Sequence, residues 1–472
     1  MTAVTPAPTV EELRAQLPGR VLEPADDGYD ADRSGFGLTH THTPKLIVSA
    51  TSTDDVVAAV KWAAANGLSV AVMSTGHGSV RPYADCVLIN TSRMNSFSID
   101  AAARTATLGA GVRWRDVIPA AHELGLATIN GSSSGVGVVG YTTGGGAPVM
   151  GRTFGFSADH VVEFELVTAD GAVRRCTPET EPELFWAVRG GKGNFGIVTS
   201  LTVNLVPVKN VYAGGLIYDG PAAETVFRTY AEWVETLPDE MTTSLALMRL
   251  PDLPFVPPPL AGKLTVHLRV VYVGDPAEGA RLLAPMRELG APIIIDGVDE
   301  VPYTRIDEVH RDPVDPLPVW ESGITLRELS SEALDALLGA AGSSVEIPLV
   351  MVEVRHLGGA MGREPGVPNA VPGRDAKFSF WCLGPMFPGL DAIVPGVGHH
   401  MLDVMRPWAA PGRLMNFLGD AWSKDEVAAC WPVETYERLC TIKKTVDPQN
   451  LFRHGHALEP VITMPAQAAP AE

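Results

Sequence analysis

The chain has 472 residues, of which 46% are hydrophobic and 19% are charged, so it can bury a large core and is long enough for two or three domains. Its 36 Lys and Arg residues are outnumbered by 55 Asp and Glu residues, which gives a formal net charge of −19. This acidity argues against a nucleic-acid partner, because affinity for the phosphate backbone comes largely from Lys and Arg. No basic run or basic amphipathic helix indicates a membrane surface either.

Cysteine usage and the N-terminal sequence bear on the cellular compartment. The cysteines are scattered, odd in number and never spaced as CxxC: Cys86, Cys176, Cys382, Cys430 and Cys440. This pattern argues against a disulfide framework or a zinc ribbon and favours a reducing compartment. The first residues lack a basic segment followed by an apolar one, and no run of 18 apolar residues occurs. We therefore expect a cytoplasmic protein without a membrane span, either a monomer or a homodimer.

The predicted elements begin with a short helix at 10–17, followed by a strand, a helix and a second strand. The first strand covers 46–48. Thr53-Asp54-Asp55 offers N-cap chemistry for a helix with apolar residues at helical spacing. Asn66-Gly67 ends that helix, and 68–73 forms the second strand. The three elements make one strand–helix–strand unit.

The next part of the chain predicts antiparallel strands and short helices. Alternating segments within 87–112 are typical of antiparallel strands, and 113–125 is an amphipathic helix ending at Gly125. Residues 159–176 read as a hairpin about Asp170-Gly171. A helix, a glycine loop and a strand follow within 183–208.

From about residue 211 the pattern changes to longer helices and strand-like runs. Helices are predicted at 222–235 and 331–341. The strand-like runs are 244–250, 263–274, 344–359 and 376–385. This part therefore predicts a second domain, an antiparallel sheet with covering helices, and the C-terminal tail is a helix ending in a stop signal at "DPQNLF".

Glycine clusters mark candidate ligand loops. Gly135 to Gly140 matches G-x-G-x-x-G, but "NGSSS" before it is no strand and Gly144-Gly145-Gly146 soon after it disfavours a helix. A dinucleotide fingerprint is therefore not favoured, and no Walker A loop occurs. Glycines in one such cluster usually serve turns and packing. Three clusters beside strands, at 74–79, 131–146 and 190–196, favour a backbone that approaches an extended nucleotide cofactor.

Five histidines raise the question of a metal: His40, His42, His77, His454 and His456. No carboxylate or cysteine partner lies at ligand spacing, so we predict no metal site. An isolated histidine is most often a hydrogen-bonded structural residue. His77 departs from that default only if its flanking glycines, Gly76 and Gly78, have a function.

Six motifs occur in an order that resembles a known family: "SVAVMSTGHGS", "GSSSGVGVVGYTTGGG", "GRTFGFSADHV", "VTADG", "ELFWAVRGGKGNFGIVT" and "DPQNLFRHGHALEP". Together they resemble the FAD-linked oxidases of the berberine-bridge-enzyme group, within the vanillyl-alcohol-oxidase superfamily. The resemblance implies an α+β fold with a PCMH-type FAD-binding domain of two α+β subdomains at 1–210, completed by 415–472. The substrate domain would span 211–414, with an antiparallel sheet covered by helices.

The resemblance also implies FAD as the cofactor. In that family the histidine of the Gly-His motif, here His77, is bonded covalently to the flavin 8α-methyl. Many relatives add a cysteine two residues after a glycine, but Gly131 is followed here by Ser132 and Ser133, so a single histidyl bond is expected. The other implied FAD contacts are Ser74, Thr75, Gly76, Gly78, Ser79, Gly135, Val136, Gly137, Gly140, Thr142, Thr143, Gly144, Gly145, Gly146, Gly196, Val198, Asn450, Phe452, His454 and His456.

The implied activity is that of an FAD-linked oxidoreductase. It would oxidise a small molecule, such as a natural-product alcohol or amine, with flavin as hydride acceptor and O2 reoxidising the flavin to give H2O2. The alternatives are a flavin dehydrogenase with another electron acceptor and a flavin-binding protein with altered catalysis. Reaction with a small-molecule substrate and O2 would need no other partner.

The catalytic base is expected from the substrate sheet. Strand alternation places Glu353 and Arg355 on one face, where they could act as base and anchor, or form an ordinary structural ion pair. Leu414 stands where relatives often have a catalytic tyrosine. Tyr141, Tyr303 and Trp381 are further candidates, with Glu353 first.

Overall fold

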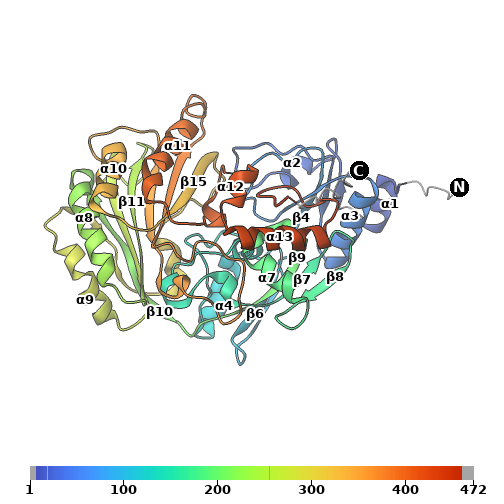
Figure 1. Ribbon diagram of the computed structural model, residues 1–472, viewed down its shortest axis with the longest axis horizontal. Coiled ribbons are helices and arrows are strands. Elements are labelled where there is room, and N and C mark those ends of the chain that lie inside the picture. The colour runs from blue at the N-terminus through green and yellow to red at the C-terminus, as the bar shows by residue number, and fades with distance from the viewer. Residues whose placement is uncertain (1–6, 19, 255, 422, 460–472) are drawn as a thin grey trace, which may run out of the picture.

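The computed structural model describes residues 7–18, 20–254, 256–421 and 423–459, and it shows an α+β protein built around three sheets. Figure 1 shows the eight-stranded sheet and its helices on one side of the molecule and the two smaller sheets on the other. The N-terminal helices α1 (Val10–Gln16) and α2 (Tyr29–Asp32) lie with the smaller sheets.

The first sheet carries the strand that ends in the Gly-His-Gly motif. Its order is β1-β2-β4-β3, and its members are β1 (Val21–Leu22), β2 (Leu46–Ser49), β3 (Val70–Met73) and β4 (Val87–Asn90). Helix α3 (Thr53–Ala65) joins β2 to β3, and a capping box between Ser52 and Asp55 starts it. The predicted strand–helix–strand unit is therefore present, with β4 inserted between its two parallel strands.

The second sheet is antiparallel, in the order β5-β6-β9-β7-β8. Its strands are β5 (Phe97–Asp100), β6 (Thr105–Gly109), β7 (Val161–Val167), β8 (Val173–Cys176) and β9 (Ile197–Asn204). The hairpin predicted about Asp170-Gly171 is β7–β8. Helices of this part are α4 (Trp114–Glu123), α5 (Val138–Thr143), α6 (Gly151–Phe154) and α7 (Pro182–Gly191).

The third sheet is antiparallel, in the order β13-β10-β12-β11-β16-β17-β15, with β14 also paired to β10. Its strands are β10 (Asn210–Asp219), β11 (Met241–Leu250), β12 (Lys263–Tyr272), β13 (Ile293–Asp296), β14 (Asp299–Pro302), β15 (Val319–Leu326), β16 (Met351–His356) and β17 (Phe378–Pro385). The chain enters this sheet between β9 and β10. The domain limits at 210/211 and 414/415 stay predictions.

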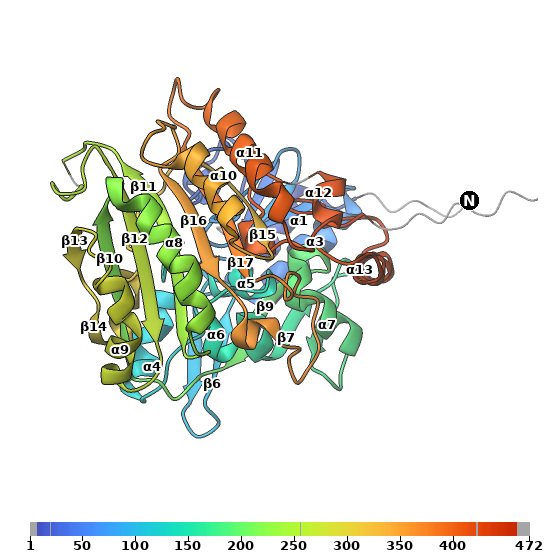
Figure 2. The same cartoon turned by 60° about the vertical axis from the view of Figure 1, so that its left-hand side comes forward.

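Helices cover one face of the large sheet, as Figure 2 shows for α8 (Ala223–Trp233), α10 (Ser331–Ala341) and α11 (Val394–Met405); α9 (Pro276–Arg287) packs beside β10. Strand residues of this face, such as Leu245, Val352 and Phe380, are fully buried against them. Burying one such side chain contributes about 1.5–3 kcal/mol. The opposite face is therefore the one free to form a ligand site.

Strand register gives the composition of that opposite face. Directly paired residues share a face, and so do residues two apart along a strand. One row is Glu321, Leu383, Met351 and Met248; the next is Gly323, Trp381, Glu353 and Ala246; the third is Thr325, Ser379, Arg355, Ser244 and Arg269. These rows confirm that Glu353 and Arg355 lie together, opposite Val352 and Val354.

The C-terminal segment returns to the two smaller sheets. Helices α12 (Lys424–Ala428) and α13 (Val433–Val446) lie beside them in Figure 1, and α13 packs on α7. Short 3-10 turns complete the fold: η1 (Ser157–His160), η2 (Lys192–Asn194), η3 (Gly220–Ala222), η4 (Val234–Thr236), η5 (Tyr303–Glu308), η6 (Gly359–Gly362), η7 (Arg406–Trp408) and η8 (Met415–Phe417). Within the described residues, no helix has the length and apolarity needed to cross a membrane.

Candidate active site

A cavity of about 550 Å³ lies between the large sheet and the two smaller sheets. This volume falls in the range of cofactor and small-molecule sites. The loop after β3, the glycine segments and the C-terminal tail form its walls with the large sheet. Of the residues predicted from sequence, those lining it are Ser74, Thr75, Gly76, His77, Gly78, Ser79, Val136, Gly137, Gly140, Tyr141, Thr143, Gly196, Val198, Arg355, Trp381, Phe452, His454 and His456.

The other predicted residues do not reach the cavity surface: Gly135, Thr142, Gly144, Gly145, Gly146, Tyr303, Glu353 and Asn450. Thr142 is fully buried, and its hydroxyl pairs with that of Ser157. Gly146 gives room to the ring of Tyr141, since a Cβ there would lie 2.6 Å from that ring. These residues pack behind the residues that line the cavity.

His77 is held in a defined orientation at the cavity wall. Its ring stacks on Phe36 at a centroid distance of 3.9 Å, and its Nδ1 lies 2.8 Å from the hydroxyl of Thr75. Burial lowers the pKa of His77 to about 4, and the nearby charges of Arg113 and Arg115 act in the same direction. The imidazole is therefore neutral at pH 7, which is the nucleophilic form.

Of the two glycines that flank His77, Gly76 occupies a position where the backbone requires glycine. Its φ is +74°, and an added Cβ would lie 2.6 Å from Cα of Gly35, because segment 35–37 runs against the loop with Phe36 N–H donating to the Thr75 carbonyl. At Gly78 a Cβ would meet no atom within 4 Å. The sequence alone does not distinguish these two glycines.

Gly76→Ala is therefore expected to destabilise the protein and reduce its flavin content, with the left-handed backbone alone costing about 1–2 kcal/mol. Gly78→Ala, the matched control, should unfold at nearly the wild-type temperature. Thermal unfolding and the ratio of flavin to protein absorbance measure both effects. Equal unfolding temperatures for the two variants would contradict the role of the Gly35–Gly76 contact.

Tyr141 lies between two glycines, with Cβ positions of Gly131 and Gly146 only 2.8 and 2.6 Å from its ring. The side-chain amide of Asn416 donates to its carbonyl oxygen at 2.8 Å. Burial raises the pKa of Tyr141 well above its usual value, so the hydroxyl is protonated at pH 7. Its oxygen accepts or donates no hydrogen bond among the described residues.

Tyr303 is not placed to act as a catalytic base. Its hydroxyl donates to the Thr128 carbonyl at 3.0 Å and to Asn130 Oδ1 at 2.7 Å, and its side chain is fully buried behind the cavity wall. This geometry does not favour the predicted catalytic role of Tyr303, because the ring supports the segment that leads into the glycine region and its hydroxyl is already hydrogen-bonded there.

Glu353 and Arg355 form a charged cluster with Arg269. Glu353 accepts from Arg355 Nε at 2.5 Å and from Arg269 Nη1 at 2.6 Å, and its side chain has no exposed surface. Burial alone raises the pKa of Glu353, but the two guanidinium groups outweigh it and the net shift is downward. With both oxygens engaged, Glu353 orients Arg355, whose guanidinium faces the cavity over the ring of Phe417.

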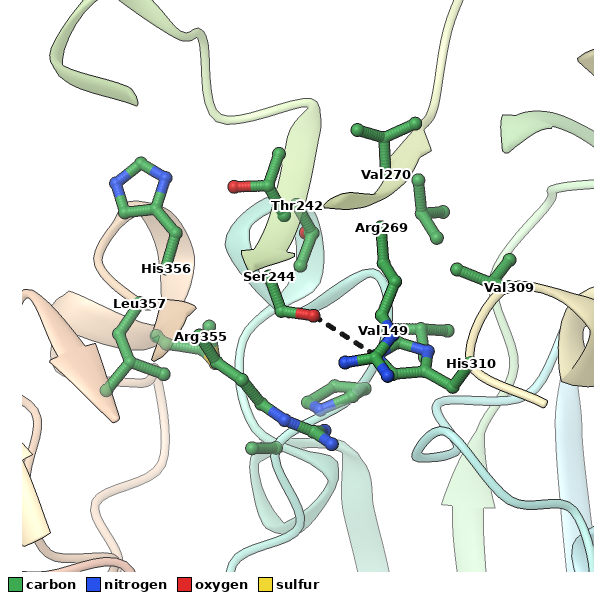
Figure 3. A pocket seen from close by; sticks show the side chains of 15 residues that line it. Val149, Thr242, Ser244, Arg269, Val270, Val309, His310, Arg355, His356 and Leu357 are labelled. Carbon is green, nitrogen blue, oxygen red and sulfur yellow. Dashed lines mark hydrogen bonds between the residues drawn. The ribbon is translucent and has the colours of Figure 1, made fainter. Parts of the chain in front are cut away.

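A second, smaller pocket of about 30 Å³ adjoins this cluster, with room for a water molecule. Figure 3 shows Ser244, Arg269, His310 and Arg355 around it, with the Ser244 hydroxyl 3.4 Å from His310 Nε2. Burial lowers the pKa of His310 well below its usual value. The polar side chains of this cluster therefore share the pocket wall with apolar residues such as Val270, Val309 and Leu357.

A buried lysine is one of the groups that hold the C-terminal segment beside the cavity. Lys443 Nζ donates to Asp447 at 2.7 Å and to the carbonyls of Asn194 and Phe452 at 2.9 and 2.7 Å. Asp447 also accepts from the backbone of Phe452 and of Leu451. This cluster ties the tail to the glycine loop, which is how residues 450 to 456 come to lie beside the N-terminal sheets.

Several ionisable residues that the sequence did not single out also line the cavity, among them Lys192 and Glu321. Lys192 lies in the glycine loop with φ of +56°, a strained conformation for a residue other than glycine. In the sequence, the one feature that could have identified Lys192 is its position among the glycines of this loop. Glu321 lies on edge strand β15, and no feature of "VWESGITL" distinguishes it from a solvent-exposed glutamate.

Comparison with known proteins agrees with this architecture. A family model described as an FAD binding domain matches residues 44–177, and one described as berberine and berberine like matches residues 423–459. These two segments supply the loop of His77 and the C-terminal helix with its tail. The resemblance to the FAD-linked oxidases of the berberine-bridge-enzyme group is thereby confirmed.

Relatives match over nearly the whole chain. The (R)-6-hydroxynicotine oxidase of Paenarthrobacter nicotinovorans is 28% identical, covering 94% of this chain and 97% of its own length. An FAD-linked oxidoreductase of Dictyostelium discoideum is 25% identical, covering 96% and 97%. Among solved structures, 6-hydroxy-D-nicotine oxidase from Arthrobacter nicotinovorans has a TM-score of 0.81 at 24% identity, covering 94% and 98%. The Physcomitrella patens BBE-like 1 protein has a TM-score of 0.82 at 20% identity, covering 96% and 99%.

Proposed function

We propose that this FAD-linked oxidoreductase is an oxidase of small-molecule alcohols or amines whose FAD is bonded through His77 alone. FAD, when bound, supplies the two-electron chemistry and the reaction with O2. The protein supplies the tether, the walls that position the cofactor, and the charged groups of the large sheet. The observation that carries the proposal is the neutral, stacked His77 at the wall of a cofactor-sized cavity.

The single tether follows from the residues around the cavity. Ser133 lines it where a cysteine would provide a second bond, and none of the five cysteines does. All five thiols are buried and unpaired. A serine hydroxyl at neutral pH is a much weaker nucleophile than a thiolate.

The five free thiols also fit a reducing compartment, so we place the protein in the cytoplasm.

The substrate class rests on the wall formed by the large sheet. Met248, Met351, Leu383 and Trp381 give an apolar surface for the body of a small molecule. Arg355, fixed by Glu353, offers guanidinium N–H groups as an anchor for a substrate oxygen. An apolar wall with few fixed polar groups suits a natural-product alcohol or amine. The relatives named for hydroxynicotine oxidation support the amine as one member of this class.

An oxidase requires rapid reoxidation by O2. Holoenzyme reduced by dithionite and mixed with oxygenated buffer is expected to regain its oxidised flavin spectrum quickly and to yield one H2O2 per flavin. Slow reoxidation that is accelerated by an artificial electron acceptor would instead identify a dehydrogenase. Rapid reoxidation with no bleaching by any member of a broad alcohol and amine panel, 6-hydroxynicotine included, would favour a flavin-binding protein with altered catalysis.

A further inference from the structure

We propose that Glu321 is the catalytic base, the group that takes the proton from the hydroxyl or amine of the substrate. This assignment rests on the proposed function and names the residue that completes it. Two carboxylates, Glu321 and Glu353, lie on the cavity face of the same sheet, in neighbouring rows and two strands apart. They differ in what surrounds them.

Glu353 is saturated, whereas Glu321 is free to react. Both oxygens of Glu353 accept from guanidinium groups, and its side chain is fully buried. Glu321 lines the cavity, and its carboxylate forms no hydrogen bond or ion pair with any residue in the described part of the chain. A base must reach the proton that it removes, so accessibility in the cavity favours Glu321.

The backbone of Glu321 is fixed although its carboxylate is free. Asp420 N–H donates to the Glu321 carbonyl at 2.9 Å, and Gly419 packs so closely that a Cβ there would lie 1.9 Å from that carbonyl oxygen. Strand β17 pairs with the other edge of β15, where Leu383 lies directly opposite Glu321. A reactive side chain on a fixed backbone keeps its position through the reaction.

The charges around Glu321 suit proton transfer near neutral pH. Burial raises the pKa of Glu321 to about 7, with Lys192 lowering it and Asp312 raising it. Other ionisable residues near its strand include Asp420, His456, whose Nε2 is hydrogen-bonded to the Gly419 carbonyl, and Arg413, which donates to the Gly323 carbonyl at 2.7 Å. Burial lowers the pKa of Lys192 to about 8, which the negative charge of Glu321 partly offsets. Two carboxylates with pKa values displaced in opposite directions are the pattern expected of an acid–base site.

Glu321 would take the hydroxyl or amine proton while the substrate carbon gives up its hydrogen with both bonding electrons, so a C=O or C=N bond forms. FAD, when bound, would be the acceptor of that hydride. Bound FAD would hold these two electrons until O2 takes them up together with two protons as H2O2. Glu321 then returns its proton to solvent through the cavity mouth.

The test uses tethered holoenzyme and 4-methoxybenzyl alcohol as the probe, in wild type, Glu321→Gln, Glu353→Gln, Lys192→Met and Asp312→Asn. Stopped-flow flavin bleaching under anaerobic conditions is expected to rise with pH through about pH 7 in wild type, because only ionised Glu321 accepts a proton. Glu321→Gln should slow it at high pH by at least ~100-fold and flatten the profile. Lys192→Met should move the midpoint of this pH profile upward, because Lys192 lowers the pKa of Glu321. Asp312→Asn should move it downward, because Asp312 raises that pKa.

A second arm needs no reacting probe. Difference infrared spectroscopy of the holoenzymes should show a protonated carboxyl that titrates near pH 7 in wild type and Glu353→Gln but is absent in Glu321→Gln. If that signal survives in Glu321→Gln, or if Glu321→Gln bleaches at the wild-type rate, the assignment is wrong. A changed flavin spectrum without a changed rate would place Glu321 on the cofactor and also overturn it. A failure of the proposed function would differ, because wild-type protein would then lack tethered flavin or fast reoxidation.

Discussion

Replacing His77 by alanine is expected to abolish acid-stable flavin. His77 is a neutral imidazole at the cavity wall, and none of the described residues lining the cavity is a cysteine that could bond to the flavin in its place. The lining imidazoles of His454 and His456 have Nε2 hydrogen-bonded to the Ser69 hydroxyl and the Gly419 carbonyl. FAD should still bind, because the cavity walls remain, but it should leave the polypeptide on acid precipitation. The measurement is flavin absorbance and fluorescence in the pellet and the supernatant.

Ser133→Ala is the matched control for that variant. It removes the hydroxyl at the position of the second tether in relatives and should leave all flavin in the pellet. Retention of acid-stable flavin by His77→Ala would show that another side chain carries the bond. Loss of it in Ser133→Ala would contradict the single tether.

Lys443→Met is expected to give the largest loss of stability. Lys443 and Asp447 are both fully buried, and the ammonium also donates to the carbonyls of Asn194 and Phe452. Removing it leaves a buried carboxylate without its cation and two carbonyls without a donor, which costs about 3–5 kcal/mol. Flavin content should fall with stability, because the same cluster places the tail beside the cavity.

Lys424→Met provides the comparison, since Lys424 pairs with Glu459 at 2.9 Å on the exposed surface. Exposed pairs contribute little, so this variant should unfold close to the wild-type temperature. Thermal and urea unfolding of both variants test the contrast. A Lys443→Met protein as stable as the Lys424→Met protein would show that the buried cluster does not hold the tail.

Local patterns in the sequence predicted much of the fold. Helix 331–341 is present with the expected limits, because Ser330 caps it and its apolar residues repeat at helical spacing. Alternation in β16 predicted the shared face of Glu353 and Arg355. The insertion of β4 between β2 and β3 was not predictable, because it depends on a pairing between strands that are not adjacent in the chain.

The candidate site was predicted less completely. The loop of His77 could be identified from its motif. The engagement of the Glu353 carboxylate by two guanidinium groups could not, because Arg269 lies 84 residues away on another strand. The reactivity of Glu321 was not predictable for the same reason. Its pKa is set by burial and by the charges of Lys192 and Asp312, which come from distant segments of the chain. Contacts between segments far apart in the chain, rather than local residue patterns, decide which carboxylate is reactive.

Peptide mapping of the wild-type protein is the most direct test of a covalent bond between FAD and His77. Acid-denatured holoenzyme is digested with a protease, and the yellow, fluorescent peptide is sequenced by mass spectrometry. We expect a single flavin-bearing peptide that contains residues 74–79, with the added mass on His77. Flavin recovered entirely free in the acid supernatant, or attached to any other peptide, would contradict the account.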